Sequence, residues 1–163
     1  MVIAAPRSGT GWAANWLTTD MSLCYHGLSA RAPMERWQTL ESDRMLGTAE
    51  TALWWAAEML NLYPARKVIL HRDPAEICAS LQMPELLERI EHMQTSLCDI
   101  DGMHVRWDQM FDDPAPIYEH LLQRPFDGER HAELVRLQVT CMPKRVTFDP
   151  DAVRQMQLEM ACS

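Results

Sequence analysis

Short apolar stretches alternate with longer amphipathic ones along this chain. Five stretches have the length and composition of strands, at residues 2–5, 21–26, 44–50, 67–72 and 102–108. Between them apolar residues recur at helical spacing, as in 84–97, where Ile90, Met93 and Leu97 follow one another by three or four positions. Strands that alternate with helices in this way predict βαβ units. We therefore expect an α/β protein with three α/β/α layers and a mainly parallel central sheet of about five strands.

Two helix start signals stand out. Asp73 and Pro74 combine a residue that caps a helix N-terminus with one favoured at the first helical position, and Asp113 and Pro114 repeat the pattern. The length indicates a single domain, 1–163, with a helical C-terminal part from about residue 126 and a loop or short extended segment at 143–148. Further helices are expected after Gly11 and over 29–40, 51–62, 84–97, 127–139 and 150–160.

Charge and cysteine content narrow the class of protein. The chain has 15 basic and 23 acidic residues, whereas nucleic-acid-binding domains usually carry a basic face, so no general nucleic-acid partner is expected. A local basic site for one nucleotide is compatible with this balance. The five cysteines are widely spaced and form no CxxC pair, which is typical of reduced proteins rather than of disulfide frameworks or zinc sites. No apolar run approaches the length that spans a bilayer, so we expect a cytoplasmic protein with no membrane partner.

The first apolar stretch leads into a loop suited to an anion. Val2–Ala5 is followed by Pro6-Arg7-Ser8-Gly9-Thr10-Gly11 and then by a segment with helical spacing. Glycine permits close backbone approach, serine and threonine supply hydroxyls, and the Arg7 guanidinium matches a phosphate or sulfate. The first N–H groups of the next helix would point at the same place. Walker A is excluded because no lysine precedes the hydroxyl residue; the alternative is an ordinary strand-to-helix turn with a surface arginine.

A second strand-to-helix junction carries similar chemistry. The apolar stretch that ends near His71 is followed at once by Arg72 and by the Asp73 helix start. Ser80 lies two turns along that helix, eight residues after Arg72. A guanidinium and a hydroxyl at this spacing are again suited to a phosphate.

Together the two stretches resemble the sulfotransferase family, in the form of a small bacterial- or phage-type member. The family's donor is 3′-phosphoadenosine 5′-phosphosulfate (PAPS). Its first motif is a PxSGTTW-type loop that binds the 5′-phosphosulfate. Its second motif is an arginine at a strand end and a serine eight residues later, which hold the 3′-phosphate. The matching residues are Pro6, Arg7, Ser8, Gly9, Thr10, Gly11 and Trp12 in the first motif, and Arg72, Asp73, Pro74 and Ser80 in the second.

The resemblance implies a P-loop NTPase-like fold and a set of roles. Arg7 and the loop amides would hold the 5′-phosphosulfate, and Trp12 would lie near the adenine. Arg72 and Ser80 would bind the 3′-phosphate, and no metal would be needed. The implied donor-binding residues are Arg7, Ser8, Gly9, Thr10, Gly11, Trp12, Arg72 and Ser80.

Several positions depart from the family pattern. Arg7 stands where many cytosolic members have a catalytic lysine, although arginine occurs in the bacterial and tyrosylprotein branches. Gly11 stands where threonine is usual, which removes one hydroxyl from the phosphosulfate site. The sequence also lacks the late RKGxxGxW-type segment that closes over the 3′-phosphate in cytosolic members. Lys144 and Arg145 are interpreted as a surface pair, with a 3′-phosphate contact as the alternative.

Two side chains at strand ends are candidates for the base that takes the acceptor's proton. His26 ends the second predicted strand and titrates near neutral pH; its alternative role is to cap the strand end. In many family members an acidic residue follows the equivalent histidine, and here Gly27 takes that position. Glu50 ends the third predicted strand, and its alternative role is a carboxylate at a helix N-terminus.

The resulting hypothesis is a PAPS-dependent sulfotransferase with Arg7, His26 and Glu50 as the catalytic set. A hydroxyl or amine of an acceptor would displace 3′,5′-adenosine bisphosphate at sulfur. One alternative is a P-loop nucleotide or metabolite kinase, which the missing Walker lysine disfavours. Another is a nucleotide-binding or interaction protein without turnover, favoured by Gly11, Gly27 and the short acceptor region. The sequence leaves open the acceptor, small molecule or protein, and the oligomeric state.

Overall fold

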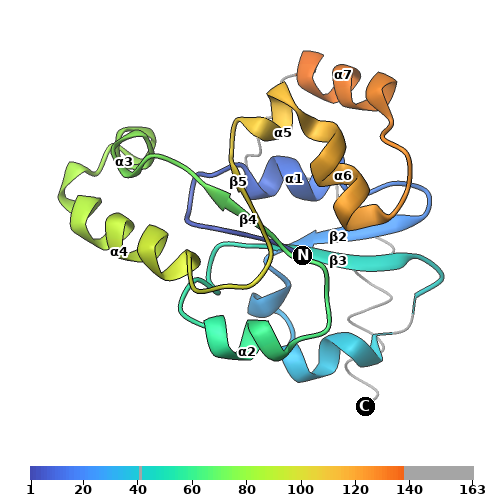
Figure 1. Ribbon diagram of the computed structural model, residues 1–163, viewed down its shortest axis with the longest axis horizontal. Coiled ribbons are helices and arrows are strands. Elements are labelled where there is room, and N and C mark those ends of the chain that lie inside the picture. Colours follow the sequence, from blue (N-terminus) through green and yellow to red (C-terminus); the bar gives the residue numbers. More distant parts are fainter. Residues whose placement is uncertain (41, 138–163) are drawn as a thin grey trace.

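One parallel sheet forms the centre of the molecule in a computed structural model that describes residues 1–40 and 42–137 (Figure 1). Within these ranges the sheet has five strands in the order β2-β3-β1-β4-β5, and every neighbouring pair is parallel. The predicted α/β class and five-strand sheet are confirmed. The strands are β1 (Val2–Ala4), β2 (Ser22–His26), β3 (Met45–Glu50), β4 (Val68–His71) and β5 (Met103–Arg106).

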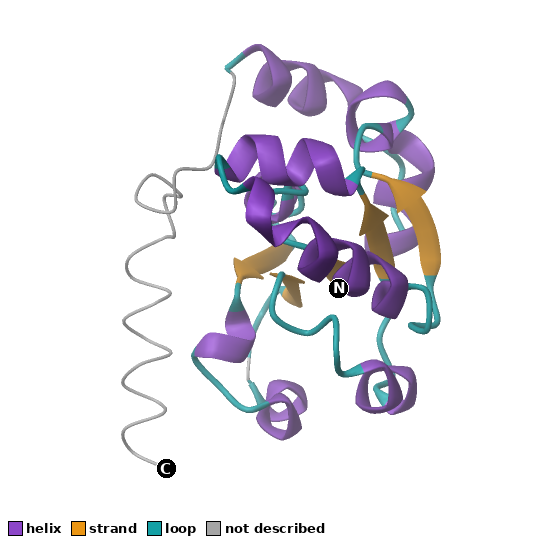
Figure 2. Cartoon of the chain, turned by 90° about the vertical axis from the view of Figure 1, so that its left-hand side faces the viewer, coloured by secondary structure: helices purple, strands orange, loops and turns teal. Residues whose placement is uncertain are grey.

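Helices cover both faces of this sheet, which completes the predicted three layers (Figures 1 and 2). On one face lie α1 (Thr10–Trp16), α5 (Gln109–Asp112), α6 (Pro114–Leu122) and α7 (Gly128–Arg136). On the other face lie α2 (Ala57–Leu62), α3 (Pro74–Leu81) and α4 (Leu87–Leu97), together with the 3₁₀ helices η1 (Leu28–Ala30), η2 (Met34–Thr39) and η3 (Pro84–Leu86).

The strands β1 and β4 are apolar and buried over residues 2–4 and 68–70 because both of their faces are covered, whereas the edge strand β5 carries the exposed His104 and Arg106. In β1, Val2 and Ala4 pack into the core on the α1 side, whereas Ile3 packs into the core on the α3 side, and each of the three is at most 1 % exposed. Successive side chains of a strand point to opposite faces, so a sheet between two helix layers needs an unbroken apolar run. The stretches at 2–5 and 68–70 have this character.

Two predicted helices are wrong in extent. The helix expected over 29–40 is replaced by η1 and η2, because Pro33 lacks an N–H group and disfavours helical geometry at the residue before it. The helix expected over 51–62 begins only at Ala57. Its first part is a turn, closed by a hydrogen bond from Ala56 N–H to the Leu53 carbonyl, that seats both side chains in the core. Burial of these two residues outweighs their local helical pattern.

Other expectations agree closely with the structure. The Asp73 side chain accepts hydrogen bonds from the N–H groups of Ala75 and Glu76, at 2.7 and 3.2 Å, and Pro74 is the first residue of α3. The segment expected as a strand over 102–108 pairs only through Arg106. The predicted loop at 143–148, helix at 150–160 and pair Lys144–Arg145 lie outside the described residues. In the described part of the chain, no helix is long and apolar enough to cross a membrane.

The strand order creates a crevice at one edge of the sheet. β1 and β4 are neighbours, with Ala4 opposite Leu70. The chain leaves β1 through α1 on one face and returns as β2, whereas it leaves β4 through α3 on the other face and returns as β5. Because the two connections diverge to opposite faces, the carboxyl ends of β1 and β4 form the topological switch point of the sheet, which is the crevice meant below. Open α/β sheets bind their ligands at such a point.

Candidate functional site

Each of four neighbouring strands ends beside one of the residues that the sequence predicts to be functional. His26 ends β2, Glu50 ends β3, Arg7 lies in the turn after β1, and Arg72 directly follows β4. Since all four strands are parallel, these positions line one edge of the sheet in that order. The expected common edge is therefore present, with Arg7 and Arg72 at the crevice.

The turn after β1 has an unusual backbone. Arg7 has φ 62° and Gly9 has φ 81°, so both lie in the left-handed region that side chains other than glycine rarely adopt. A Cβ atom on Gly9 would lie 2.7 Å from Cε of Met110, so only glycine fits here without displacing the core. The Ser8 hydroxyl is fully buried and has no hydrogen-bond partner within the described residues. A buried hydroxyl of this kind is a candidate contact for a bound anion.

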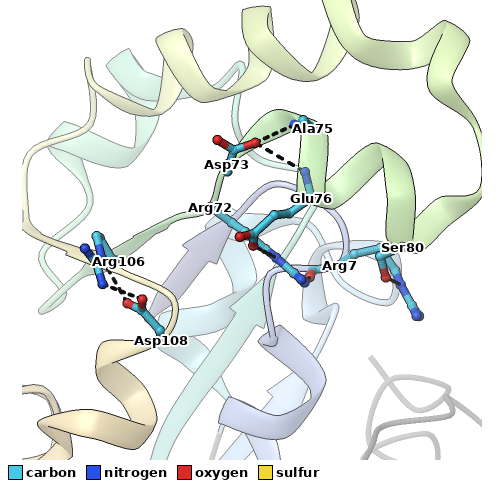
Figure 3. A network of polar contacts seen from close by, with 8 residues as sticks. All are labelled: Arg7, Arg72, Asp73, Ala75, Glu76, Ser80, Arg106 and Asp108. Carbon is cyan, nitrogen blue, oxygen red and sulfur yellow. Dashed lines mark hydrogen bonds and ion pairs between the residues drawn. The ribbon is translucent and has the colours of Figure 1, made fainter.

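The turn after β1 meets α3, so the two sequence motifs come together (Figure 3). Arg7 Nε donates to the Ser80 hydroxyl at 3.0 Å, across 73 positions of the chain. Arg72 Nη1 donates to the carbonyl oxygen of Arg7, across 65 positions. The Arg72 guanidinium thus meets the backbone of Arg7, and the Arg7 guanidinium meets the Ser80 hydroxyl, so the three residues form one hydrogen-bonded cluster beside the ends of β1 and β4.

Two further side chains hold Arg72. Its Nε donates to a Glu76 carboxylate oxygen at 3.1 Å, and its Cζ lies 4.2 Å from the ring centroid of Trp107. The Arg72 side chain is only 17 % exposed, whereas that of Glu76 is 55 % exposed. In the described part of the chain Arg72 Nη2 has no hydrogen-bond partner. The guanidinium therefore keeps donors for an anion that approaches from the crevice.

His26 lies against the start of α1 and is half-buried. Its Nε2 is 3.2 Å from the Thr10 hydroxyl, which links the end of β2 to the loop after β1. Burial lowers the pKa of His26 below its usual 6.5; the positive charge of Arg31 adds to this shift, and the negative charge of Glu50 opposes it. The imidazole is therefore neutral at pH 7 and able to accept a proton.

Glu50 has a different environment. It is fully buried, and one carboxylate oxygen accepts hydrogen bonds from Ser29 N–H at 3.0 Å and from the Thr48 hydroxyl. The other oxygen accepts from the Ser29 hydroxyl at 2.6 Å. These contacts anchor the first turn of η1 to the end of β3. They fit the alternative role, a carboxylate at a helix N-terminus, better than that of a base open to an acceptor.

Trp12 lies in the core rather than at the edge of the crevice. It is 7 % exposed, and its ring is 4.7 Å from that of Phe111, 5.2 Å from that of Trp16 and 5.4 Å from that of His131, measured between centroids. Its faces are covered by protein. The position expected beside an adenine is thus occupied by a packing residue, and Gly11 beside it is also buried.

The contacts of Trp107 and Glu76 with Arg72 were not predicted from the sequence. One signal was present for Trp107, because it directly follows β5 as Arg72 directly follows β4, and these strands are paired with His71 opposite Arg106. For Glu76 the only signal was its distance of four residues from Arg72, which is one helical turn.

One cleft of the described residues lies away from this edge of the sheet. A cleft of about 280 Å³ is lined by Met45, Tyr63 and Arg66, among others, at the end of the sheet where β3 and β4 begin. Its lining includes Thr48 but none of Arg7, His26, Glu50, Arg72 and Ser80, so this cleft is separate from the cluster at the carboxyl ends of the strands. Within residues 1–40 and 42–137, no three His, Cys, Asp or Glu side chains are placed to hold a metal ion.

Comparisons of this chain with protein-family models, curated proteins and solved structures found no match. Its function is therefore inferred from residues and geometry.

Proposed function

We propose that this chain is a PAPS-dependent sulfotransferase that transfers a sulfuryl group to a hydroxyl or amine of an acceptor still to be identified. The observation that carries the proposal is the convergence of Arg7, Arg72 and Ser80 between the ends of β1 and β4. An acidic protein that places two guanidinium groups within one hydrogen-bonded cluster has a local site for a multiply charged anion.

The residues present fit a nucleotide with phosphates at two positions. Arg72 has unused N–H donors on the β4 side, and the Ser80 hydroxyl, which accepts from Arg7, still has its own hydrogen to donate. On the β1 side the buried Ser8 hydroxyl lacks a partner among the described residues, and the first N–H groups of α1 lie beyond it. These are two sets of donors, one for each phosphate-bearing end of the nucleotide.

The chain's own groups then have distinct tasks. PAPS, when bound, supplies the sulfuryl group and the leaving 3′,5′-adenosine bisphosphate. Arg7 stabilises negative charge that develops on the phosphate oxygen, a role whose removal typically slows a reaction about 10²–10³-fold. His26 is neutral because of its burial and takes the proton of the acceptor, while Thr10 orients its ring.

The second candidate is a nucleotide-binding protein without turnover. The observation that favours it is the environment of Glu50, whose two oxygens are engaged by Ser29 and Thr48, which leaves His26 as the single accessible base candidate. Gly27, which follows His26, contributes no carboxylate to assist it. In this case the site binds the bisphosphate but transfers nothing.

Calorimetric titration with 3′,5′-adenosine bisphosphate, 5′-AMP and ATP with Mg²⁺ tests the donor site. We expect the wild-type protein to prefer the bisphosphate and Arg72→Ala to lose about tenfold or more in affinity, since a hydrogen bond to a charged group contributes about 1.5–3 kcal/mol. Arg106→Ala is the matched control, because Arg106 lies on the neighbouring strand and is paired with Asp108. Tighter binding of ATP with Mg²⁺, or no binding, would replace this proposal with a kinase or a nucleotide-free protein.

Transfer from radiolabelled PAPS to a panel of phenols, alcohols and amines separates the two candidates. We expect wild-type protein to label at least one class and His26→Ala to lose labelling while it keeps its affinity for the bisphosphate. Binding without labelling of any class would favour the protein without turnover. Unchanged labelling by His26→Ala would remove His26 from the catalytic set.

A further inference from the structure

The contact between Arg72 and Trp107 is built on rigid parts of the fold. The Trp107 N–H donates to the carbonyl of His71 at 2.9 Å, a bond that belongs to the pairing of His71 with Arg106 and places Trp107 beside the base of Arg72. The Trp107 ring packs edge-on against Phe111 at 5.6 Å, and Phe111 packs on the buried Trp12 at 4.7 Å. A row of aromatic rings therefore connects Arg72 to the core.

Two hydrogen bonds and one ring contact hold the Arg72 guanidinium. Glu76 accepts from a single nitrogen, Nε, and its side chain is more than half exposed, so this ion pair is weak by itself. Arg7 accepts through its backbone oxygen. The ring of Trp107 instead covers one face of the guanidinium at 4.2 Å, within the range of a cation–π interaction. The ring lies against the guanidinium carbon, so it limits how far the group can turn about its hydrogen bonds to Glu76 and Arg7.

We propose that Trp107 is a positioning residue that holds the Arg72 guanidinium in the orientation that binds the 3′-phosphate. This inference rests on the proposed function for the identity of the anion. It requires arginine rather than lysine at position 72, because a planar guanidinium stacks on a ring and presents a fork of donors, whereas an ammonium does neither. Trp107 is half-buried and belongs to neither of the two buried core clusters of the described residues, so its role is not to fill the core.

The test has a first arm that needs no ligand. In the free wild-type protein, the Nε–H signal of Arg72 should lie upfield of other arginine signals because of the Trp107 ring current; Arg72→Lys identifies the signal by removing it. We expect Trp107→Leu to return it to the range of exposed arginines and Trp107→Phe to restore part of the shift. Amide spectra and thermal unfolding check that each variant is folded.

The second arm is calorimetry with 3′,5′-adenosine bisphosphate. We expect Trp107→Leu to bind about tenfold more weakly, in line with a cation–π contact that orders a charged donor, and Trp107→Phe to stay within about threefold of wild type. In an Arg72→Ala background, Trp107→Leu should cause no further loss, because the group that it orients is gone.

Either arm can overturn the inference. An unchanged Arg72 signal in folded Trp107→Leu would show that the ring does not hold the guanidinium. Equal losses for Trp107→Leu with and without Arg72 would show that Trp107 acts on binding by another route. If wild-type protein binds no bisphosphate, the proposed function fails and the anion role of Trp107 with it, whereas the spectroscopic arm still decides whether Trp107 holds Arg72.

Discussion

Burial and hydrogen-bond partners distinguish His26 from Glu50, two residues that the sequence treated alike. Both end parallel strands at the same edge of the sheet. Glu50 is fully buried, with donors on both of its oxygens, whereas His26 is half-buried with one hydroxyl contact. A buried, fully bonded carboxylate stabilises the fold, whereas a half-buried imidazole is available for proton transfer.

The pKa of His26 gives a prediction at this scale. Burial should make the ring titrate below 6.5, as followed by its NMR ring-proton shifts and assigned with His26→Gln. Because its pKa is lower in the folded state, the unfolded chain binds the proton first on acidification. The contribution of His26 to stability is then complete above about pH 6.5 and is lost as pH falls from there through the folded pKa.

Burial also lowers the pKa of His71, so the free energy of unfolding falls with acid in the His26→Gln variant as well. The change in unfolding free energy between pH 7 and pH 5 should nevertheless be smaller in His26→Gln than in wild type. A His26 signal that titrates at or above 6.5 would contradict the prediction.

At the scale of elements, the turns that follow β1 and β2 each contain a glycine with a positive φ, but the two glycines differ in how much space surrounds them. Gly9 precedes α1 with φ 81°, and Gly27 precedes η1 with φ 72°. Both therefore require a left-handed backbone. The space around them differs: a Cβ on Gly9 would meet Cε of the buried Met110 at 2.7 Å, whereas one on Gly27 would meet nothing within 4 Å in the described part of the chain.

Alanine substitutions at Gly9 and Gly27 should separate the cost of backbone strain from the cost of steric crowding against Met110. Gly27→Ala should lower the free energy of unfolding by about 1–2 kcal/mol, the cost of a left-handed backbone. Gly9→Ala should lower it by a further 1–3 kcal/mol or so, since Met110 must move within a packed core. Urea denaturation measures both values. Equal losses would mean that Met110 moves aside freely.

At the scale of the whole molecule, the sheet separates two apolar layers, and each contains a buried cysteine. Cys24 belongs to the layer on the α1 side, and Cys78 to the layer on the α3 side. Burial raises the pKa of Cys24 to about 12, so its thiol stays protonated. Cys98 is exposed. These three thiols can therefore report on the surface and on both layers in one experiment.

Iodoacetamide labelling followed by peptide mass spectrometry should show this order. Cys98 should react in the native protein. Cys24 and Cys78 should react at least roughly a hundredfold more slowly, because the core must open before the reagent reaches them. In increasing urea the two buried thiols should become reactive over the same concentration range, as expected for a single cooperative domain. Exposure of one thiol well before the other would show that the two layers unfold separately.

Local patterns were sufficient for most of the architecture. Short stretches rich in apolar residues predicted all five described strands within a few residues, most clearly β1 and β4, because strands covered on both faces require apolar residues. Asp73 and Pro74 predicted the start of α3, since capping depends on neighbours in the chain. The helices expected over 29–40 and 51–62 failed where Pro33, or the burial of Leu53 and Ala56, overrode helical spacing.

The candidate site depended on both the sequence and the tertiary structure. Residue types and spacing alone identified Arg7, Arg72 and Ser80, because guanidinium and hydroxyl groups at strand ends are an anion-binding chemistry wherever they occur. Only the tertiary structure decided that Arg7 reaches Ser80, that Trp107 stacks on Arg72, and that Trp12 is a core residue. These contacts join residues from different strands and helices, and strand order and packing across the sheet determine which of them meet. The spacing of residues along the chain carries no direct record of that order.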